Sequence, residues 1–256
     1  MHDGVFVIGA DTGIGKTMIA CAVAAAAHKL GLRTAVFKPV ETGCRREGRR
    51  LVGEDVEKLV AAAGGTQGPA EAAGALFETP AAPLAAAAAE GQEISIDRLG
   101  DQAGTLIDTH DFTVIEGAGG LLVPIADGVT WLDLIEEFDV PVVCVAGDRL
   151  GCVNHTLLTL DRLESEGSEI CGFILNRLQP EADSLTGENH SDRDGEATRN
   201  RGMPTRNREL IERFSDQRCL GEFPYVKEGE RSDFAKLAEY AQQALNLNAI
   251  LGSDAG

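Results

Sequence analysis

Short apolar segments rich in β-branched residues recur along the chain and alternate with longer segments of helical periodicity. The apolar segments, each expected to be a buried strand, are Val5–Ile8, Thr34–Phe37, Phe112–Ile115, Val140–Val145, Ile170–Leu175 and, more weakly, Cys219–Phe223. The expected helices are Lys16–Leu30, Asp55–Ala63, Ile96–Thr109, Trp131–Phe138, Asn154–Glu164 and Phe234–Leu247. Strands that are apolar throughout and separated by helices are typical of a mostly parallel sheet covered by helices on both faces. The alternation therefore predicts a three-layer α/β fold that binds ligands at the carboxyl ends of its strands.

Length and charge narrow the possible functions. The 256 residues fit one domain spanning 1–256, and 25% charged with 43% apolar residues is close to the average of folded proteins. With 41 acidic against 23 basic residues the net charge is -18, so the average field repels nucleic acid and anionic lipid. No apolar run approaches the roughly 18 residues that a membrane-spanning helix requires. We expect neither a nucleic-acid nor a membrane partner.

The cysteines and two atypical segments carry no predicted chemistry. The six cysteines are scattered without a C-x-x-C pair, and the N-terminus shows no basic, then apolar leader, so we expect reduced thiols in a cytoplasmic protein. Residues Leu84–Ala89 are alanine-rich and predict a helix or loop skirting the solvent. Residues 179–208 are polar almost throughout and predict a mobile surface insertion, because such a segment buries too little surface to offset its ordering entropy.

A glycine-rich loop joins the first expected strand to the first expected helix. It reads Gly9-Ala10-Asp11-Thr12-Gly13-Ile14-Gly15-Lys16-Thr17, a Walker A loop except that Ala10 stands where the pattern has its first glycine. Such a loop directs backbone N–H groups at phosphates, a lysine neutralises the outer phosphates and a hydroxyl ligates magnesium. Lys16 and Thr17 occupy the last two positions. Together with the predicted sheet, the loop indicates a P-loop NTPase fold that binds ATP or another nucleotide.

Two further positions follow expected strands and so reach the binding edge of the sheet. Lys38 follows the strand Thr34–Phe37, and its ammonium there can offset charge on a phosphoryl group in transfer. Glu116 follows the strand Phe112–Ile115 at the Walker B position, where an acid commonly assists magnesium binding. Asp55 begins an expected helix, a place where an acid serves either as a helix cap or as a metal ligand.

The loop and several later blocks together resemble the dethiobiotin synthetase family. The blocks are Lys38-Pro39-Val40-Glu41-Thr42-Gly43, Gly53-Glu54-Asp55, Glu116-Gly117-Ala118-Gly119-Gly120, Leu150-Gly151-Cys152-Val153-Asn154-His155-Thr156, Gly172-Phe173-Ile174-Leu175-Asn176 and Gly221-Glu222-Phe223-Pro224. They occur in the family's order between about residues 5 and 225. Two positions depart from the family's usual loop, which often has Glu where this chain has Gly13 and Thr where it has Ala10.

The resemblance implies a reaction of biotin synthesis. In that family 7,8-diaminononanoate takes up carbon dioxide as a carbamate, ATP phosphorylates the carbamate, and the second amine closes a ureido ring with loss of phosphate. The resemblance further implies Mg²⁺ as cofactor and a homodimer with the substrate site at the interface.

The resemblance also implies roles for individual residues. The catalytic residues implied are Lys38, Lys16 and Thr12. The ATP-binding residues implied are Gly13, Ile14, Gly15, Lys16, Thr17, Met18, Asp55, Glu116, Gly117, Ala118, Gly119, Asn176, Arg177, Pro224 and Tyr225. The substrate-binding residues implied are Lys38, Thr42, Gly151, Cys152 and Asn154. The magnesium ligands implied are Thr17, Asp55 and Glu116, with the resemblance alone selecting Asp55 over Glu54. Glu41 receives no role, and His155 is expected to be structural.

Two other functions use a related ATP-binding domain. A cobyrinate-type amide synthetase carries an attached glutaminase domain, for which this chain has no residues left. A nucleotide-switched ATPase of the partition or septum-placement type carries a second lysine in the loop, where this chain has Asp11. Such a switch also has no need of the Lys38 to Gly43 block, so we keep it only as the alternative.

Overall fold

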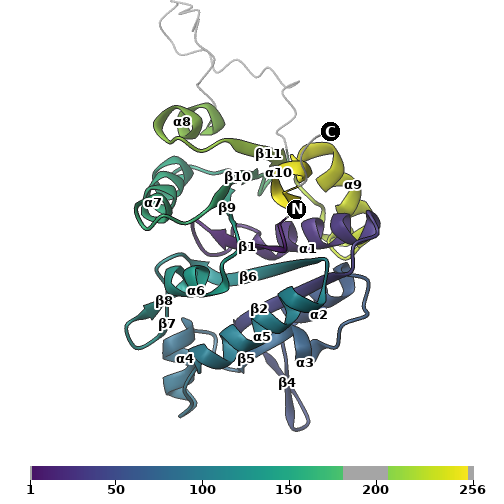
Figure 1. Ribbon diagram of the computed structural model, residues 1–256, viewed down its shortest axis with the longest axis vertical. Helices are drawn as coiled ribbons and strands as arrows, with labels where there is room; N and C mark the ends of the chain where they lie inside the picture. Colours follow the sequence, from purple (N-terminus) through teal and green to yellow (C-terminus); the bar gives the residue numbers. More distant parts are fainter. Residues whose placement is uncertain (1, 181–206, 253–256) are drawn as a thin grey trace, which may run out of the picture.

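A computed structural model describes residues 2–180 and 207–252, and its centre is a seven-stranded sheet (Figure 1). The strands of this sheet are β1 (Gly4–Gly9), β2 (Thr34–Thr42), β5 (Ala73–Phe77), β6 (Phe112–Gly120), β9 (Val142–Gly147), β10 (Ile170–Asn176) and β11 (Cys219–Phe223). Their order is β11-β10-β9-β1-β6-β2-β5, and every neighbouring pair is parallel. The predicted α/β fold with a parallel central sheet is confirmed.

Helices cover both faces of the sheet. The helices are α1 (Lys16–Lys29), α2 (Glu54–Ala62), α3 (Pro69–Ala72), α4 (Pro83–Ala89), α5 (Ile96–Thr109), α6 (Trp131–Phe138), α7 (Cys152–Ser165), α8 (Asn207–Phe214), α9 (Phe234–Ala244) and α10 (Leu247–Leu251), with a 3-10 turn at Glu228–Glu230. Two short antiparallel hairpins lie outside the sheet: β3 (Arg45–Glu47) with β4 (Arg50–Val52), and β7 (Pro124–Ala126) with β8 (Val129–Thr130). Figure 1 shows α1 and α9 on one side of the sheet and α6 and α7 on the other.

The alternation of side chains along β1 explains why both faces need cover. Val5 and Val7 join the apolar cluster under α1, α2 and α9, whereas Phe6 and Ile8 join the cluster under α5 and α6. All four side chains are fully buried. A strand that is apolar on both faces is stable only between two helical layers, which is the arrangement that its sequence predicts.

The chain order places a binding crevice beside β1. From β1 the chain proceeds through β2 and β5 to one side and returns through β6, and it then crosses to β9, β10 and β11 on the other side. Ligands of open α/β sheets bind where the strand order reverses in this way. The glycine-rich loop follows β1 and therefore lies at the reversal point.

Trp131 connects the core to the loop that follows β6. Its ring is fully buried 6.1 Å from the ring of Phe6, between centroids, and its Nε1 donates a 2.6 Å hydrogen bond to the carbonyl oxygen of Ala118. A buried indole N–H usually finds such an acceptor. The hydrogen bond fixes the backbone at Ala118, next to the expected nucleotide site.

Some boundaries differ from expectation for identifiable reasons. The expected helix Phe234–Leu247 is divided into α9 and α10, because Asn246 caps a new helix by accepting a hydrogen bond from the Ala249 backbone N at 3.2 Å. The alanine-rich segment forms α4, but Ala86 and Ala87 are buried, so one face packs on the core instead of skirting the solvent.

Two further expectations concern the polar segment at 179–208 and membrane-spanning helices. Most of the expected insertion at 179–208 lies outside the described residues. In the part of the chain that is described, no helix combines the length and apolarity needed to cross a bilayer.

Candidate active site

The glycine-rich loop is tied to the end of β10 by an asparagine. Asn176 donates its Nδ2 to the carbonyl oxygen of Ile14 at 2.8 Å and is buried. Gly15 lies directly beneath, with a φ of 88°, and a Cβ there would lie 2.2 Å from Asn176 Nδ2. Both the left-handed backbone and the close approach require glycine. Since α1 has no side-chain cap at its start, its first N–H groups are available to an anion.

Lys16 and Asp11 hold the rest of the loop. Lys16 Nζ donates to the Asp11 carbonyl oxygen at 2.9 Å, while the Asp11 side chain accepts a 2.7 Å hydrogen bond from the Thr12 backbone N. The Asp11 carboxylate also pairs with Arg149, and His155 Nδ1 approaches it to 3.6 Å. The Thr12 backbone hydrogen bond and the Arg149 guanidinium lower the pKa of Asp11 below its usual value. The loop is thereby fixed against the segment that leads into α7.

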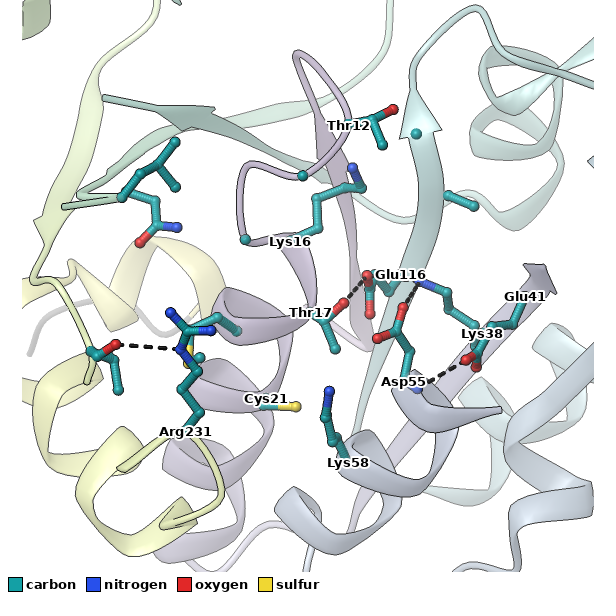
Figure 2. Close-up of a pocket in the computed structure, with 18 of the residues that line it drawn as sticks. Thr12, Lys16, Thr17, Cys21, Lys38, Glu41, Asp55, Lys58, Glu116 and Arg231 are labelled. Atoms are coloured by element: carbon teal, nitrogen blue, oxygen red, sulfur yellow. Dashed lines mark hydrogen bonds and ion pairs between the residues drawn. The ribbon is translucent and has the colours of Figure 1, made fainter. Parts of the chain in front are cut away.

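A cluster of four side chains, called here the Lys38 cluster, lies below the loop and consists of Thr17, Lys38, Asp55 and Glu116. Lys38 Nζ donates to Glu116 Oε1 at 2.8 Å and to Asp55 Oδ2 at 3.1 Å, and Thr17 Oγ1 donates to Glu116 Oε1 at 2.8 Å. Figure 2 shows these side chains converging from α1, β2, α2 and β6. Residues 99 positions apart in sequence, Thr17 and Glu116, thus share one site.

One ammonium shared between two carboxylates leaves the cluster one negative charge in excess. Burial disfavours the charged form of Lys38, but Glu116 and Asp55 outweigh it and raise its pKa above the usual value. Burial also raises the pKa of Asp55, yet Lys38 more than offsets this and the pKa is lowered overall. The Glu116 side chain is only 1% exposed, and burial raises its pKa despite Lys38. The more deeply buried carboxylate therefore carries the cost of the excess charge.

A cavity of about 550 Å³ brings most of the expected site residues together. The expected residues that line it are Thr12, Gly13, Gly15, Lys16, Thr17, Met18, Lys38, Thr42, Asp55, Glu116, Ala118, Gly119, Asn176, Arg177 and Tyr225. Ile14, Gly117 and Pro224 do not line it. Ile14 is buried beneath the loop, and a Cβ at Gly117 would meet the side chains of Ile8 and Phe6 in the core.

Three of the residues expected to bind the substrate lie at a separate place, the start of α7. Gly151 has a φ of 93° and precedes the helix, which begins at Cys152. The helix therefore begins two residues before the expected start at Asn154, and Asn154 lies in its first turn. The three residues Gly151, Cys152 and Asn154 do not line the cavity.

The cavity also contains residues to which the sequence assigned no role. These are Cys21, Glu41, Lys58, Leu178, Val226 and Arg231. Of these residues, only Glu41 could have been identified from the sequence, since it stands after an expected strand within the block Lys38 to Gly43. Cys21 follows Thr17 by one helical turn and becomes visible only once the helix is placed. Arg149, outside the cavity, pairs with Asp11 across 138 residues of sequence.

Nucleotide affinity is expected to fall as pH rises above about 8, because burial lowers the pKa of Lys16 to about 8 in the nucleotide-free protein. Above that pH the free protein loses the ammonium that attracts the phosphates, so the Kd for ADP should rise by at most about tenfold per pH unit. Calorimetric titration without magnesium from about pH 7 to 9.5 measures this, with adenosine as the control ligand that lacks phosphates. A Kd for ADP that stays constant over this range would contradict the assigned role of Lys16.

Comparison with solved structures places the fold among P-loop ATPases. A ParA family ATPase from Chlorobium tepidum has a TM-score of 0.53 over 96% of this chain and 95% of that one, at 14% identity. The septum site-determining protein MinD of Pyrococcus horikoshii, in complex with Mg-ADP, has a TM-score of 0.54 over 98% of this chain and 93% of its own, at 15% identity. Similarity at such low identity shows the fold alone.

Comparison of sequences is more specific. A family model described as an AAA domain matches residues 3–232. The ATP-dependent dethiobiotin synthetase BioD of Anaeromyxobacter dehalogenans strain 2CP-C is 45% identical over 183 residues, covering 70% of this chain and 79% of that protein. The protein of the same name from Aromatoleum aromaticum is 38% identical over 68% of this chain and 78% of its own length. The chain belongs to the ATP-dependent dethiobiotin synthetase family, as its motifs predict.

Proposed function

We propose that this chain carries out ATP-dependent carboxylation and ring closure of 7,8-diaminononanoate, giving dethiobiotin, ADP and phosphate. The observation that carries the proposal is the placement of Lys38 in one cavity with the phosphate loop, where Lys16 is also buried. Two lysines, one for the phosphates and one for an anionic acceptor, suit phosphoryl transfer between two negatively charged molecules. A nucleotide switch acting on a partner protein has no need of the second lysine on β2.

Residues of the cavity would support the first two of the three chemical steps. One amine attacks carbon dioxide and loses a proton, and Lys38 and the Thr12 hydroxyl would hold the carbamate that results. A carbamate oxygen then attacks the γ-phosphorus of ATP and ADP departs, with Lys16 neutralising the phosphate oxygens. The second amine attacks the carbonyl carbon of the mixed anhydride, phosphate leaves and takes up the proton that the amine loses, and the ureido ring closes. In this scheme Thr42 would bind polar atoms of the diamine.

The Lys38 cluster offers suitable oxygen ligands for Mg²⁺. Glu116 Oε2 is buried without a hydrogen-bond partner, Asp55 is about one-third exposed, and the Thr17 hydroxyl lies 2.8 Å from Glu116. No group of three or more His, Cys, Asp and Glu residues with metal-binding spacing occurs within residues 2–180 and 207–252. Two acids and one hydroxyl suit Mg²⁺, which takes its other ligands from phosphates and water. When bound, the ion would offset charge on the transferring phosphoryl group.

Asn176, Arg177, Pro224 and Tyr225 are proposed to contact the base of the nucleotide. Asn176 uses its Nδ2 to hold Ile14, which leaves its Oδ1 to accept a hydrogen bond from an exocyclic amine such as that of adenine. Arg177 and Tyr225 line the same cavity, whereas Pro224 does not line it and directly precedes Tyr225 in the chain.

We further propose a homodimer in which the start of α7 binds the carboxylate of the substrate held by the partner subunit. Leu150, just before α7, is fully exposed, and Leu158 within α7 is 61% exposed. Exposed large apolar side chains next to a helix N-terminus suit a subunit interface that contains an anion site. The cytoplasm is the proposed location, where the six free thiols would remain reduced.

Leu150→Glu is expected to weaken the dimer and raise the KM for the diamine, because it introduces a charge into the proposed interface. Sedimentation equilibrium measures the dissociation constant of the dimer, and steady-state kinetics measures the KM for the diamine. We expect each of these two constants to rise at least about tenfold. Leu30→Glu, at another exposed leucine, is the control. A dimer of unchanged stability in Leu150→Glu would overturn this arrangement.

The reaction itself is tested by phosphate release from purified protein with magnesium, ATP and bicarbonate, with and without the diamine. The expected result is release that depends on the diamine, together with the mass of the cyclic urea. Steady ATP hydrolysis that does not respond to the diamine would favour the nucleotide-switched ATPase.

A further inference from the structure

Helix α2 presents the Asp55 carboxylate but begins without a cap of its own. The residue before the helix is Gly53, which has no side chain to accept a hydrogen bond from the first turn. Serine, threonine, aspartate or asparagine at that position would supply the acceptor. The helix N-terminus at the site therefore requires an acceptor from elsewhere in the chain.

Glu41 on β2 supplies that acceptor. Its Oε1 accepts a hydrogen bond from the backbone N of Asp55 at 3.0 Å, and its Oε2 accepts one from the backbone N of Val56, also at 3.0 Å. The residue is only 6% exposed. Figure 2 shows the Glu41 carboxylate facing the start of the helix next to Asp55. Two hydrogen bonds to a buried, charged acceptor are stronger than those of an ordinary exposed cap.

Gly53 leaves the space that this arrangement requires. A Cβ at position 53 would lie 2.2 Å from Glu41 Oε2 and 2.6 Å from its carboxyl carbon. The backbone at Gly53, with φ of -86° and ψ of 124°, is accessible to any residue. The glycine is therefore required for the close approach of Glu41 and not for its conformational freedom.

The same strand holds Asp55 at two points. Glu41 fixes its backbone N, while Lys38, three residues earlier on β2, binds its carboxylate Oδ2 at 3.1 Å. The Asp55 carboxylate is joined to its backbone by a short side chain. Fixing the Asp55 backbone therefore limits the positions that the carboxylate oxygens can reach. Loss of the backbone contact would let the helix end move relative to Thr17 and Glu116.

We propose that Glu41 is a positioning residue for the magnesium site, capping α2 from β2 so that the Asp55 carboxylate is held in the Lys38 cluster. This inference rests on the proposed role of Asp55 as a magnesium ligand. Glu41 borders the cavity, but in this role it acts through Asp55. Gly53 is the second member of the device, because any side chain there would displace the Glu41 carboxylate.

The test compares Glu41→Ala, Glu41→Gln, Gly53→Ala and the double variant Glu41→Ala/Gly53→Ala. Calorimetric titration of the ADP complex with Mg²⁺ measures metal affinity without turnover, and the Mg²⁺ concentration for half-maximal phosphate release measures it during catalysis. The control is Gly104→Ala on α5, where a Cβ would meet nothing within 4 Å.

Glu41→Ala and Gly53→Ala are each expected to weaken Mg²⁺ binding about tenfold, the usual effect of losing a residue that orients a metal ligand. The double variant should be no weaker than Glu41→Ala, because the added Cβ then meets no carboxylate. Glu41→Gln, which retains one acceptor oxygen, should fall between. The KM for ATP at saturating Mg²⁺ should stay within about twofold of the original.

Unchanged Mg²⁺ affinity in folded Gly53→Ala and Glu41→Gln would overturn the proposal, even if Glu41→Ala failed to fold. Losses that multiply in the double variant would also overturn it. Failure of the proposed function would give a different result: the protein without substitutions would release phosphate at a rate that does not depend on the diamine. In that case the calorimetric titration still decides the role of Glu41.

Discussion

Lys38→Ala is expected to lower kcat about 100- to 1,000-fold at saturating ATP, magnesium and diamine. The ammonium is buried in the Lys38 cluster, where it already binds Glu116 at 2.8 Å and Asp55 at 3.1 Å, and one of its three N–H groups remains for the carbamate. Its interaction strengthens as charge develops on the transferring group, so its loss acts on the transition state more than on binding. Steady-state phosphate release measures the effect.

Two measurements separate this role from a structural one. ADP affinity should change little in Lys38→Ala, since Lys16 and the loop backbone hold the phosphates. Lys29→Ala, at the far end of α1 where the lysine is half-exposed beside Glu239, is the control and should retain full turnover. If Lys38→Ala turns over at the original rate, the lysine has no catalytic role.

Glu116→Gln is expected to abolish most activity and to stabilise the protein. Activity should fall at least about 100-fold and require more Mg²⁺, because one of the two proposed carboxylate ligands is lost. Unfolding should cost about 1 kcal/mol more, because an amide removes the excess negative charge while Lys38 keeps Asp55 as its partner. Residues that serve function at the expense of stability commonly behave in this way.

The direction in which the pKa of Glu116 changes on folding also predicts that Glu116→Gln is more stable. Burial raises the pKa of Glu116 above its value in the unfolded chain, so the folded state binds its proton more tightly. The contribution of Glu116 to stability therefore decreases as pH rises from the unfolded pKa through the raised folded value, and above that value the ionised group is destabilising. Thermal unfolding of Glu116→Gln and of the control Glu57→Gln measures this; a lower Tm in Glu116→Gln alone would contradict it.

The sheet could be predicted from the sequence because each central strand is apolar on both faces. All six expected strands are present, although β9 begins at Val142 and not at Val140, since Pro141 has no N–H for the ladder. The edge strand β5 was missed because its sequence, Ala-Gly-Ala-Leu-Phe, has no β-branched residue and no alternation that would distinguish it. Edge strands depend on their neighbour, which the sequence alone does not identify.

The site could be predicted where chemistry and local sequence coincide. Lys16 and Thr17 belong to a contiguous glycine-rich motif at the start of α1, and Glu116 directly follows the apolar run Phe112–Ile115 within β6. Glu41 and Arg149 were not assigned, because their partners lie 14 and 138 residues away and the contacts arise only from the packing of β2 on α2 and of the loop on α7. No local pattern distinguishes a strand-end glutamate that caps another helix from one that faces the solvent.

The hydrogen bond between Trp131 and Ala118 has a practical consequence. Trp131 is the chain's single tryptophan, its ring is fully shielded from water, and its indole N–H contacts the carbonyl of a residue that lines the cavity. The emission of a buried indole responds to small changes in its hydrogen bond and local field. The fluorescence of Trp131 is thus an intrinsic probe that contacts a cavity-lining residue, and it can report the occupancy of the cavity without a label.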